Sequence, residues 1–394
     1  MEAPLKALFY VQHLLGIGHL MRAGTLTRAL EANGIEVTLV SGGAPVPDFE
    51  SGATHFEQLP PTRAVDKFFK VLVDETDREI DDAWKNKRCD LLLDIYRRTA
   101  PDIVLIELYP FGRRQMRFEI EPLLIEARRR RQNGGAGPLI ASSVRDILVE
   151  PDKPGRVDEM VQRVQDYFDL VLIHGDPDFI AFDETFPRLN DIADLALYTG
   201  YVADAPPAPG GPHSPGYGEV IVSTGGGAVS EDMLSATLHA RALTSLADTT
   251  WRFLLGHNYP EADFLACQQA GPAGVIVERA RPDFAQLLAN CRLSISQGGY
   301  NTVMEVLATG TRAVCLPYAG GLESEQTLRC GLLAERGVIE VVTQAEVSAT
   351  AVAAAVERAL KAPKVDRAVV NMDGAQRSAV LLKEAFGRRL SAGK

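Results

Sequence analysis

The stretch SISQGGYNTVMEVLATG, residues 294–310, decides the fold of the C-terminal half of the chain. An apolar run ends at the double glycine Gly298-Gly299, and a helix-forming segment follows at once. In a parallel α/β unit, such a turn aims the N–H groups of the first helical turn at the carboxyl edge of the sheet. The stretch therefore predicts a site for an anion such as a phosphate.

Glu305 lies about one turn into the expected helix, and the sequence allows two interpretations of it. Its carboxylate can accept hydrogen bonds from both hydroxyls of a ribose that lies beyond the phosphates. Alternatively, Thr302 and Glu305 form a capping box, in which each side chain bonds the backbone N–H group of the other residue. The stretch alone leaves both interpretations open.

The same pattern of strand followed by helix runs through the rest of the chain. Leu20–Glu31 has a helical pattern that stops at Asn33-Gly34. Short apolar and β-branched runs predict strands at Leu5–Val11, Ile35–Val40, Asp102–Ile106, Pro138–Ala141, Leu170–Ile173, Glu219–Ser223, Trp251–Leu255, Val275–Val277, Leu293–Ser296 and Ala313–Leu316. This alternation predicts parallel sheets with helices on both faces.

Residues 203–218 contain five prolines and four glycines, which excludes a helix or a central strand. We therefore expect an N-terminal domain at 1–202, a linker at 203–218 and a C-terminal domain at 219–375. The last segment, 376–394, is expected to form a helix that packs back on the N-terminal domain.

The block from the double glycine through Thr302-x-x-Glu305, a strand ending in Pro317 and a polar helix start at Glu325-Gln326 resembles GT-B glycosyltransferases. The resemblance is strongest to family 28, the peptidoglycan N-acetylglucosaminyltransferase type. It implies two Rossmann-like, doubly wound domains that face each other across a cleft. It also implies that Glu305 binds the ribose, and that Glu325 and Gln326 contact the donor sugar. The other donor-site residues that it implies are Gly225, Gly226, Gly227, Arg279, Gln297, Gly298, Gly299, Asn301 and Thr302.

The first strand runs into a second glycine-containing turn, which carries His19 at an expected helix N-terminus. The positive end of a helix favours a neutral imidazole, the form that a general base needs. Gly-x-Gly-His-x-x-Arg in this turn is similar to the acceptor-side loop of GT-B enzymes, and also to nucleotide-sugar hydrolases of pseudaminic acid synthesis, in which the matching His activates water. The partner of His19 is expected to be Glu107, with Asp146 as the alternative. Further acceptor-side candidates are His13, Gly16, Gly18, Arg22 and His174, the last as a phosphate contact.

Bulk properties exclude several classes of protein. A net charge of −11 argues against a general nucleic-acid binder. We find no uninterrupted apolar run long enough to span a membrane and no signal-peptide pattern at the start, so we expect a cytoplasmic protein. The five cysteines form no C-x-x-C pair, which favours reduced thiols over disulfides or zinc. The run 128–131, four arginines, is interpreted as a solvated helix end, or else as a patch that contacts an anionic acceptor or a membrane surface.

Together these features predict an inverting, metal-independent glycosyltransferase that uses a nucleotide-sugar donor, with a leaning to UDP-sugars implied by the resemblance. No cofactor and no metal are expected, and the sugar, the acceptor and the oligomeric state stay open. A nucleotide-sugar hydrolase and a sugar-nucleotide 2-epimerase are the alternatives on the same fold. A non-enzymatic scaffold is disfavoured because both glycine turns, His19 and Glu305 are present in one chain.

Overall fold

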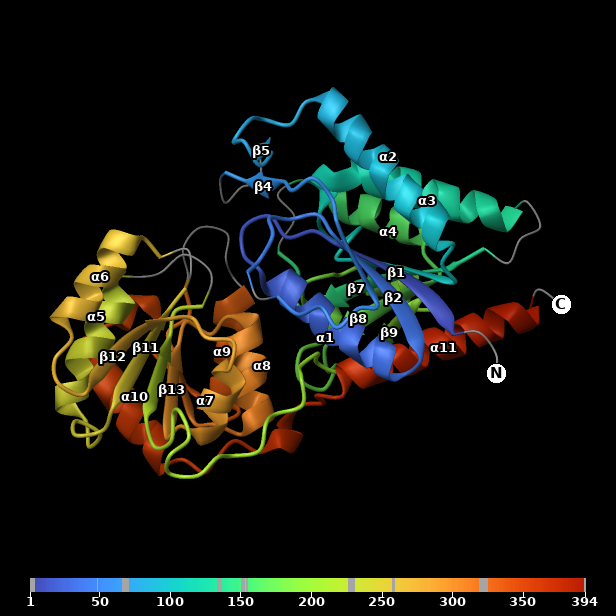
Figure 1. Cartoon of the computed structure of the whole chain (residues 1–394). Helices are drawn as coiled ribbons and strands as arrows, with labels where there is room; N and C mark the ends of the chain where they lie inside the picture. The colour runs from blue at the N-terminus through green and yellow to red at the C-terminus, as the bar shows by residue number, and fades with distance from the viewer. Residues whose placement is uncertain are drawn as a thin grey trace. The chain divides into compact units, whose positions relative to one another are not determined.

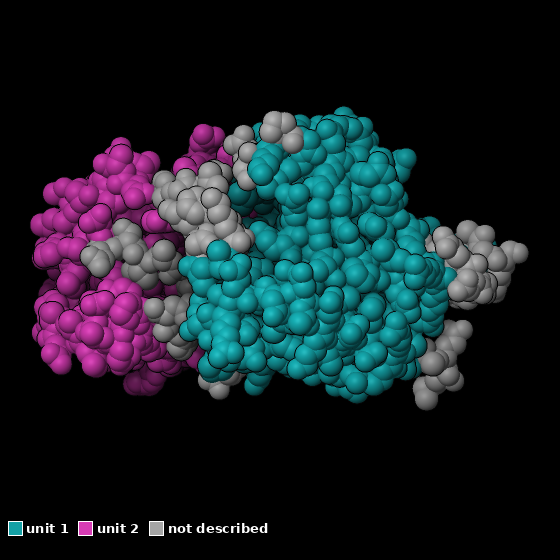
Figure 2. All heavy atoms as spheres, turned by 90° about the horizontal axis from the view of Figure 1, so that it is seen from above, with its two compact units in different colours: residues 1–202, 371–394 teal, residues 203–370 magenta. Residues whose placement is uncertain are grey.

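The computed structural model divides the 394-residue chain into two compact units (Figures 1 and 2). Unit 1 comprises residues 1–202 and 371–394, and unit 2 comprises residues 203–370. The structure describes residues 4–47, 49–65, 71–132, 137–149, 153, 155–225, 231–256, 259–318 and 325–392. The Pro- and Gly-rich segment that was expected to be a linker groups with unit 2.

Unit 1 is built on a seven-stranded sheet in the order β3-β2-β1-β6-β7-β8-β9, and every pairing in it is parallel. Its strands are β1 (Leu5–Val11), β2 (Ile35–Ser41), β3 (His55–Gln58), β6 (Ile103–Glu107), β7 (Leu139–Arg145), β8 (Leu170–His174) and β9 (Ala196–Tyr198). A separate antiparallel pair joins β4 (Arg63–Ala64) to β5 (Leu72–Val73).

Helices cover both faces of this sheet because the side chains of each strand alternate between two cores. Leu8 and Tyr10 of β1 belong to the core under α2 (Asp82–Thr99), α3 (Arg117–Gln132) and α4 (Arg156–Tyr167). Ala7, Phe9 and Val11 belong to the core under α1 (Gly18–Ala32) and α11 (Gly374–Ala392). Unit 1 is therefore doubly wound, as predicted.

Unit 2 repeats this design with six strands in the order β12-β11-β10-β13-β14-β15, again all parallel. The strands are β10 (Val220–Ser223), β11 (Trp251–Leu255), β12 (Val275–Arg279), β13 (Leu293–Ser296), β14 (Ala313–Cys315) and β15 (Glu340–Val341). The helices are α5 (Glu231–Ala240), α6 (Glu261–Ala270), α7 (Phe284–Asn290), α8 (Tyr300–Thr309), α9 (Glu325–Glu335) and α10 (Ala349–Lys361). Val220 and Val222 pack on the α5 and α10 face, whereas Ile221 packs on α7. Short 3₁₀ helices lie at 114–116, 182–184, 189–192, 241–243, 344–346 and 367–369.

The C-terminal helix α11 belongs to unit 1. Ala379, Leu382 and Phe386 are buried in the same core as Leu20 and Leu26 of α1, and residue 373 forms an isolated bridge with residue 202. The chain thus re-enters unit 1 at residue 371, five residues before the predicted start of this segment.

Two surface features bear on membrane contact. Among the described residues, no helix combines the length and apolar character that a membrane span requires. The arginine run ends α3, where Arg128 lies 3.9 Å from Asp169 and the side chains of Arg129 and Arg130 are exposed. Two of the four arginines thus project into solvent, as expected for the end of a helix.

Candidate functional site

In unit 1, the candidate residues gather where the strand order reverses. The chain passes from β1 to β2 on one side, and β6 pairs with β1 on the other side. Ligands of open α/β sheets bind at the carboxyl ends of strands at such a switch point. His19 is the second residue of α1, directly after β1, and Glu107 is the last residue of β6.

The predicted pair of His19 and Glu107 is formed. His19 Nδ1 lies 2.7 Å from Oε1 of Glu107, and Arg22, one turn further along α1, donates to the same oxygen. Glu107 is fully buried, whereas the His19 side chain is 16% exposed. Of the two imidazole nitrogens, Nε2 has no partner among the described residues, so it is the atom that can act on a substrate.

Burial lowers the pKa of His19 to about 3, against the opposing effect of the Glu107 carboxylate. Burial alone would raise the pKa of Glu107, but His19 and Arg22 outweigh it and bring that pKa to about 2. At neutral pH the imidazole is therefore neutral and the carboxylate ionised. An ionised carboxylate only accepts, so Nδ1 carries the proton and Nε2 has a free lone pair. This is the protonation state of a general base.

Two arginines that the sequence analysis did not select surround this pair. Arg113 and Arg145 each oppose protonation of His19, after the larger effect of its burial. Arg113 donates from Nε to the carbonyl of Gln12 over 2.6 Å and has a left-handed backbone with a φ of 58°. Leu108, next to Glu107, is also left-handed, with a φ of 65°. Strained residues of this kind persist where the surrounding structure fixes them, commonly at functional sites.

Asp146 and His174 do not take the roles predicted for them. Asp146 is fully buried and accepts from the hydroxyl of Tyr201 over 2.6 Å, so the partner of His19 is Glu107 alone. His174 is fully buried, with Nε2 2.7 Å from Oγ of Ser143 and Nδ1 2.9 Å from Oγ1 of Thr199. Both of its nitrogens are occupied, which leaves none for a phosphate. Both residues stabilise the strand ends instead.

His13 supports the turn between β1 and α1. This side chain is buried, places Nε2 3.0 Å from the carbonyl of Ala44, and fills the space that a Cβ on Gly43 would need. Its burial lowers its pKa, so it is neutral as well. Gly16 of this turn is less constrained by packing, because a Cβ on it would meet nothing within 4 Å. Gly18 is the first residue of α1. His13 is therefore a supporting residue of the loop.

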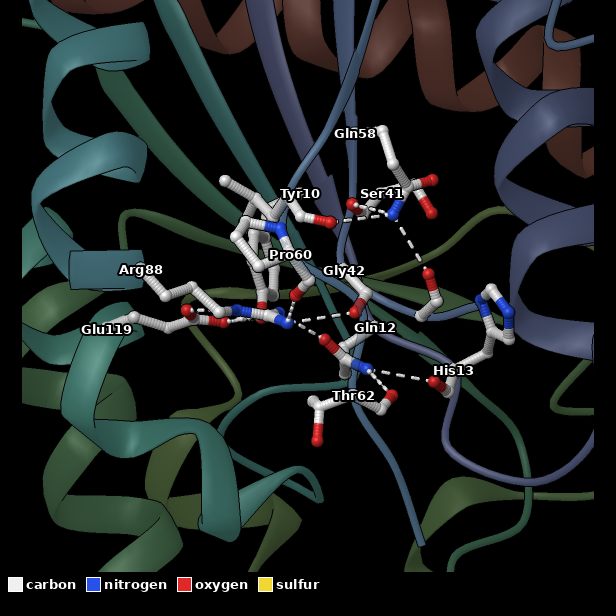
Figure 3. A network of polar contacts seen from close by, with 12 residues as sticks. Tyr10, Gln12, His13, Ser41, Gly42, Gln58, Pro60, Thr62, Arg88 and Glu119 are labelled. Atoms are coloured by element: carbon white, nitrogen blue, oxygen red, sulfur yellow. Dashed lines mark hydrogen bonds and ion pairs between the residues drawn. The ribbon is translucent and has the colours of Figure 1, made fainter. Parts of the chain in front are cut away.

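A buried polar network anchors the same loop (Figure 3). Arg88 of α2 directs all five of its N–H donors to Glu119 of α3, to the side chain of Gln12 and to the carbonyls of Gly42 and Pro60. Gln12 in turn donates to the carbonyls of residues 13 and 62. Burial and the nearby Glu119 raise the pKa of Tyr10, whose hydroxyl donates to Glu119. The network fixes the start of the turn that carries His19.

In unit 2, the two glycine turns are neighbours at the corresponding switch point. β10 leads to β11 on one side, β13 leads to β14 on the other, and the last residues of β10 and β13 pair in register. Gly225 and Gly298 both have a left-handed φ, of 66° and 72°. Each donates its N–H group to the serine two residues earlier, Ser223 or Ser296. The two turns thus share one geometry side by side, while Gly226 and Gly227 lie outside the described residues.

Among the described residues, helix α8 begins without a side-chain cap. Gly299 is the N-cap residue and makes no side-chain cap bond, and Gln297 before it is buried. Asn301 and Thr302 are the second and third residues of the helix. The capping-box interpretation of Thr302 and Glu305 is therefore wrong, because Thr302 does not occupy the N-cap position. Within the described part of the chain, no N-cap side chain competes for the amides of Asn301 and Thr302, and a helix start of this kind can bind an anion.

Glu305 is partly buried and has no hydrogen-bond partner for its carboxylate among the described residues. Burial, with a contribution from Asp204, raises its pKa to about 7. A carboxylate that is desolvated without a partner is costly, and a ligand that donates hydrogen bonds to it would relieve that cost. This is the environment expected of a residue that binds ribose hydroxyls.

The remaining donor-site candidates are held by other groups. Glu325 is buried and accepts from Arg329 over 2.8 Å, and that guanidinium lies 4.9 Å from the ring centre of Tyr300. Gln326 accepts from the N–H group of Tyr318 over 3.2 Å, so its amide nitrogen is the part that can reach a sugar. These contacts tie the start of α9 to the strand ends of the sheet.

Arg279 ends β12 and supports the loop that follows β11. It donates to the carbonyls of Gly256 and Tyr259, pairs with Glu261 and stacks 4.1 Å from the ring centre of Phe264. These contacts use both terminal nitrogens of the Arg279 guanidinium group. Arg279 therefore supports the loop that follows β11 and does not extend toward a ligand.

Comparison with known proteins agrees with this architecture. Residues 220–383 match the glycosyltransferase family 28 C-terminal domain. This match covers most of unit 2 and the start of α11. The resemblance stated from the sequence is thus confirmed.

A relative from Sinorhizobium fredii, UDP-N-acetylglucosamine–N-acetylmuramyl-(pentapeptide) pyrophosphoryl-undecaprenol N-acetylglucosamine transferase, is 33% identical over 81 residues. That alignment spans 21% of this chain and only 22% of the relative, about a fifth of its length.

Solved structures resemble the whole chain. The calicheamicin glycosyltransferase CalG4 has a TM-score of 0.57 at 16% identity, covering 99% of this chain and 95% of that one. The spinosyn rhamnosyltransferase SpnG complexed with thymidine diphosphate has a TM-score of 0.56 at 14% identity, covering 98% and 96%. At these identities the likeness concerns the fold, and the predicted GT-B fold class is confirmed.

Proposed function

We propose that the protein is an inverting glycosyltransferase that transfers a sugar from a nucleoside diphosphate donor to an acceptor hydroxyl without a metal ion. The observation that carries the proposal is the pair of glycine turns at the switch point of unit 2, next to the uncapped start of α8. The neutral His19 bound to Glu107 at the switch point of unit 1 supplies the complementary base.

The donor is bound by unit 2. The amide of Gly299 and the amides at the start of α8 hold the diphosphate beside the turns that Gly225 and Gly298 form, and the ionised Glu305 accepts from the ribose hydroxyls. The amide nitrogen of Gln326 donates to a sugar hydroxyl. We propose UDP as the nucleotide because the family 28 relative is named for a UDP-sugar, whereas the SpnG structure contains thymidine diphosphate. Titration with both nucleotides decides between them.

The reaction is a single displacement at the anomeric carbon. The acceptor oxygen attacks as Nε2 of His19 removes its proton, and the bond to the diphosphate oxygen breaks on the opposite face. Glu107 stabilises the imidazolium that forms, and Arg22 holds Glu107 in place. The negative charge that develops on the leaving diphosphate is stabilised by preorganised amides and the α8 dipole, which is why we propose no metal.

The surroundings of His19 favour an acceptor that carries negative charge near its hydroxyl. Arg113 and Arg145 disfavour a positive charge on His19, and Arg22 and Arg113 favour the negative charge of Glu107. The relative from S. fredii is named for a pyrophosphoryl-linked acceptor, which agrees with this charge. We also propose that the protein acts in the cytoplasm, because its cysteines are free thiols and its proposed substrate is a nucleotide sugar.

The test is incubation with UDP-sugars, with and without a panel of hydroxyl acceptors, in the presence and absence of a chelator. We expect acceptor-dependent release of UDP, inversion at the anomeric carbon, and rates with chelator within about twofold of those without it. Release of free sugar at the full rate without acceptor would instead identify a hydrolase. Interconversion of two donors without acceptor would identify an epimerase.

A further inference from the structure

Two buried thiols lie against the Gly298 turn of unit 2. Cys315 is the last residue of β14 and Cys330 lies in α9, and both are at most 1% exposed. Cys330 Sγ lies 3.8 Å from the carbonyl oxygen of Gly298, and Cys315 Sγ lies 3.9 Å from Oγ of Ser296. Both sulfurs also lie within 4 Å of the position that a Cβ on Gly298 would take, so the two thiols are neighbours. They connect β14, α9 and the glycine turn at a single point.

There is no spare space between these sulfurs and the turn. A Cβ placed on Gly298 would lie 2.4 Å from Cys330 Sγ and 3.7 Å from Cys315 Sγ. The conformation of Gly298, with its φ of 72°, is therefore packed directly on the thiol pair. Any change in the separation of the two sulfurs must move the turn, α9, or both.

The two thiols differ in reactivity. The neighbouring Cys330 thiol lowers the pKa of Cys315, whereas the proximity of Cys315 together with burial raises the pKa of Cys330. Cys315 is thus the thiol that ionises first, and the thiolate is the nucleophile in disulfide exchange. Cys291 lies elsewhere, and its burial raises its pKa to about 12.

We propose that Cys315 and Cys330 form a reversible disulfide that lowers the affinity of the Gly298 turn for the donor nucleotide. The reagent is a low-molecular-weight disulfide such as oxidised glutathione. The Cys315 thiolate attacks one sulfur of the reagent and releases one glutathione thiolate. Cys330 then loses its proton, attacks the Cys315 sulfur and releases the second. Two electrons pass from the cysteines to the reagent, and the two protons end on the two glutathiones.

The structural effect follows from bond length. A disulfide holds its sulfurs about 2.05 Å apart, much closer than two sulfurs that are only in van der Waals contact. Drawing Cys330 toward β14 shifts α9, whose first residues Glu325 and Gln326 border the donor site, and withdraws the support under Gly298. Because both sulfurs are buried, α9 must move for the reagent to enter. If the disulfide weakens nucleotide binding, reciprocal linkage requires bound nucleotide to disfavour the disulfide at equilibrium.

This inference rests on the proposed donor site, and the test separates the two. The full-length Cys89→Ser, Cys267→Ser, Cys291→Ser variant keeps only the pair, and is incubated with oxidised glutathione in the native state. We expect non-reduced peptide mass spectrometry to find a Cys315–Cys330 link, and to find less of it at equilibrium when UDP is present. We expect calorimetry to show UDP affinity lowered about tenfold or more, within the usual range of coupling, and restored by dithiothreitol.

Adding Cys315→Ser to this background removes the attacking thiolate and should make UDP affinity insensitive to the oxidant. Failure of the link to form, a link with unchanged affinity, or a Cys315→Ser variant that still loses affinity each overturns the inference. A reduced protein that binds no nucleotide would instead overturn the proposed function, and this regulation with it.

Discussion

His19 is the side chain on which the proposed chemistry most depends. With Nδ1 engaged by Glu107, the His19→Ala variant loses the base but no donor contact. We expect turnover to fall by about two to four orders of magnitude, the usual contribution of a general base, with nucleotide affinity unchanged. Steady-state kinetics and calorimetry on the same preparation measure both. Turnover within a few-fold of the parent would remove His19 from the mechanism.

The low pKa of His19 also predicts the pH profile. Its neutral form is the base, and a pKa of about 3 keeps it neutral at every pH above that value. We therefore expect kcat/KM for the acceptor, measured at saturating donor, to show no inflection near pH 6.5, the ordinary value for histidine. In Glu107→Gln, turnover falls because Nδ1–H loses its ionised acceptor, while the profile stays flat near pH 6.5. An acidic limb centred there would contradict the assigned protonation state.

Unlike kcat/KM for the acceptor, the affinity for the donor nucleotide is expected to depend on pH near neutrality, because of Glu305. With a pKa of about 7, the Glu305 carboxyl is mostly protonated below pH 7. Binding the ribose hydroxyls then requires it to lose that proton first. We expect UDP affinity to rise with pH, by up to about tenfold per unit below pH 7, and to level off above it. Calorimetry between pH 5.5 and 8.5 measures this. Glu305→Gln should bind more weakly and show no such slope; an equal slope in the variant would assign the titration to another group.

The same residue predicts a gain of stability when it is changed. A carboxyl whose pKa is raised on folding favours the folded state at low pH, and this advantage is lost as pH rises from about 4.5 to 7. Glu305→Gln should therefore stabilise the unliganded protein at pH 8 by up to about 3 kcal/mol, and not at pH 4. Denaturant titrations at both values test this. A loss of stability at pH 8 would show that Glu305 has a structural partner.

Helix α8 and its turn offer a matched pair of glycines. A Cβ at Gly298 collides with Cys330 in a left-handed conformation, whereas a Cβ at Gly299 meets nothing within 4 Å. We expect Gly298→Ala to cost about 1–3 kcal/mol of folding free energy, and Gly299→Ala less than about 1 kcal/mol. If the turn holds a phosphate, Gly299→Ala should still weaken UDP binding, since the methyl group occupies the approach to the backbone. Unchanged affinity in a stable Gly299→Ala protein would place the phosphate elsewhere.

What the sequence predicted well was local. Each of these features depends on about ten consecutive residues, so the sequence pattern alone was enough to locate it: the strand ends, the glycine turns and the start of the helix that carries His19. The choice between Glu107 and Asp146 could not be made this way, because both follow buried strands and only the fold shows that Asp146 bonds Tyr201. The Arg88–Glu119 pair was missed for the same reason, since it joins two helices and no periodic signal marks it.

That buried pair predicts how far the loop depends on the rest of unit 1. Arg88→Met leaves Glu119 buried without its main partner, which typically costs about 3–5 kcal/mol. Denaturant unfolding should show this loss, and turnover should fall in the fraction that is still folded because Gln12 loses its anchor. Exposed Arg97, which bonds Glu126 on the surface of the same two helices, is the matched control. Arg97→Met should change the free energy of unfolding by less than about 1 kcal/mol. Equal losses of stability in the two variants would show that the buried network does not stabilise the loop specifically.

The chain as a whole is discontinuous, and this has a consequence for its parts. Unit 2 is one continuous segment with its own sheet and cores, whereas unit 1 needs α11 to cover Leu20, Leu26 and the neighbouring strands. Without α11 this apolar face meets water, at a cost of about 25 cal/mol for each Å² left uncovered.

We therefore expect residues 203–370 expressed alone to unfold cooperatively and to gain thermal stability from UDP by mass action. Residues 1–202 alone should lack a cooperative transition, and adding a peptide of residues 371–394 should restore it. Calorimetric scans of the three samples decide the matter. A cooperative transition in residues 1–202 without the peptide would show that α11 is dispensable, and UDP stabilising that fragment rather than 203–370 would move the donor site to unit 1.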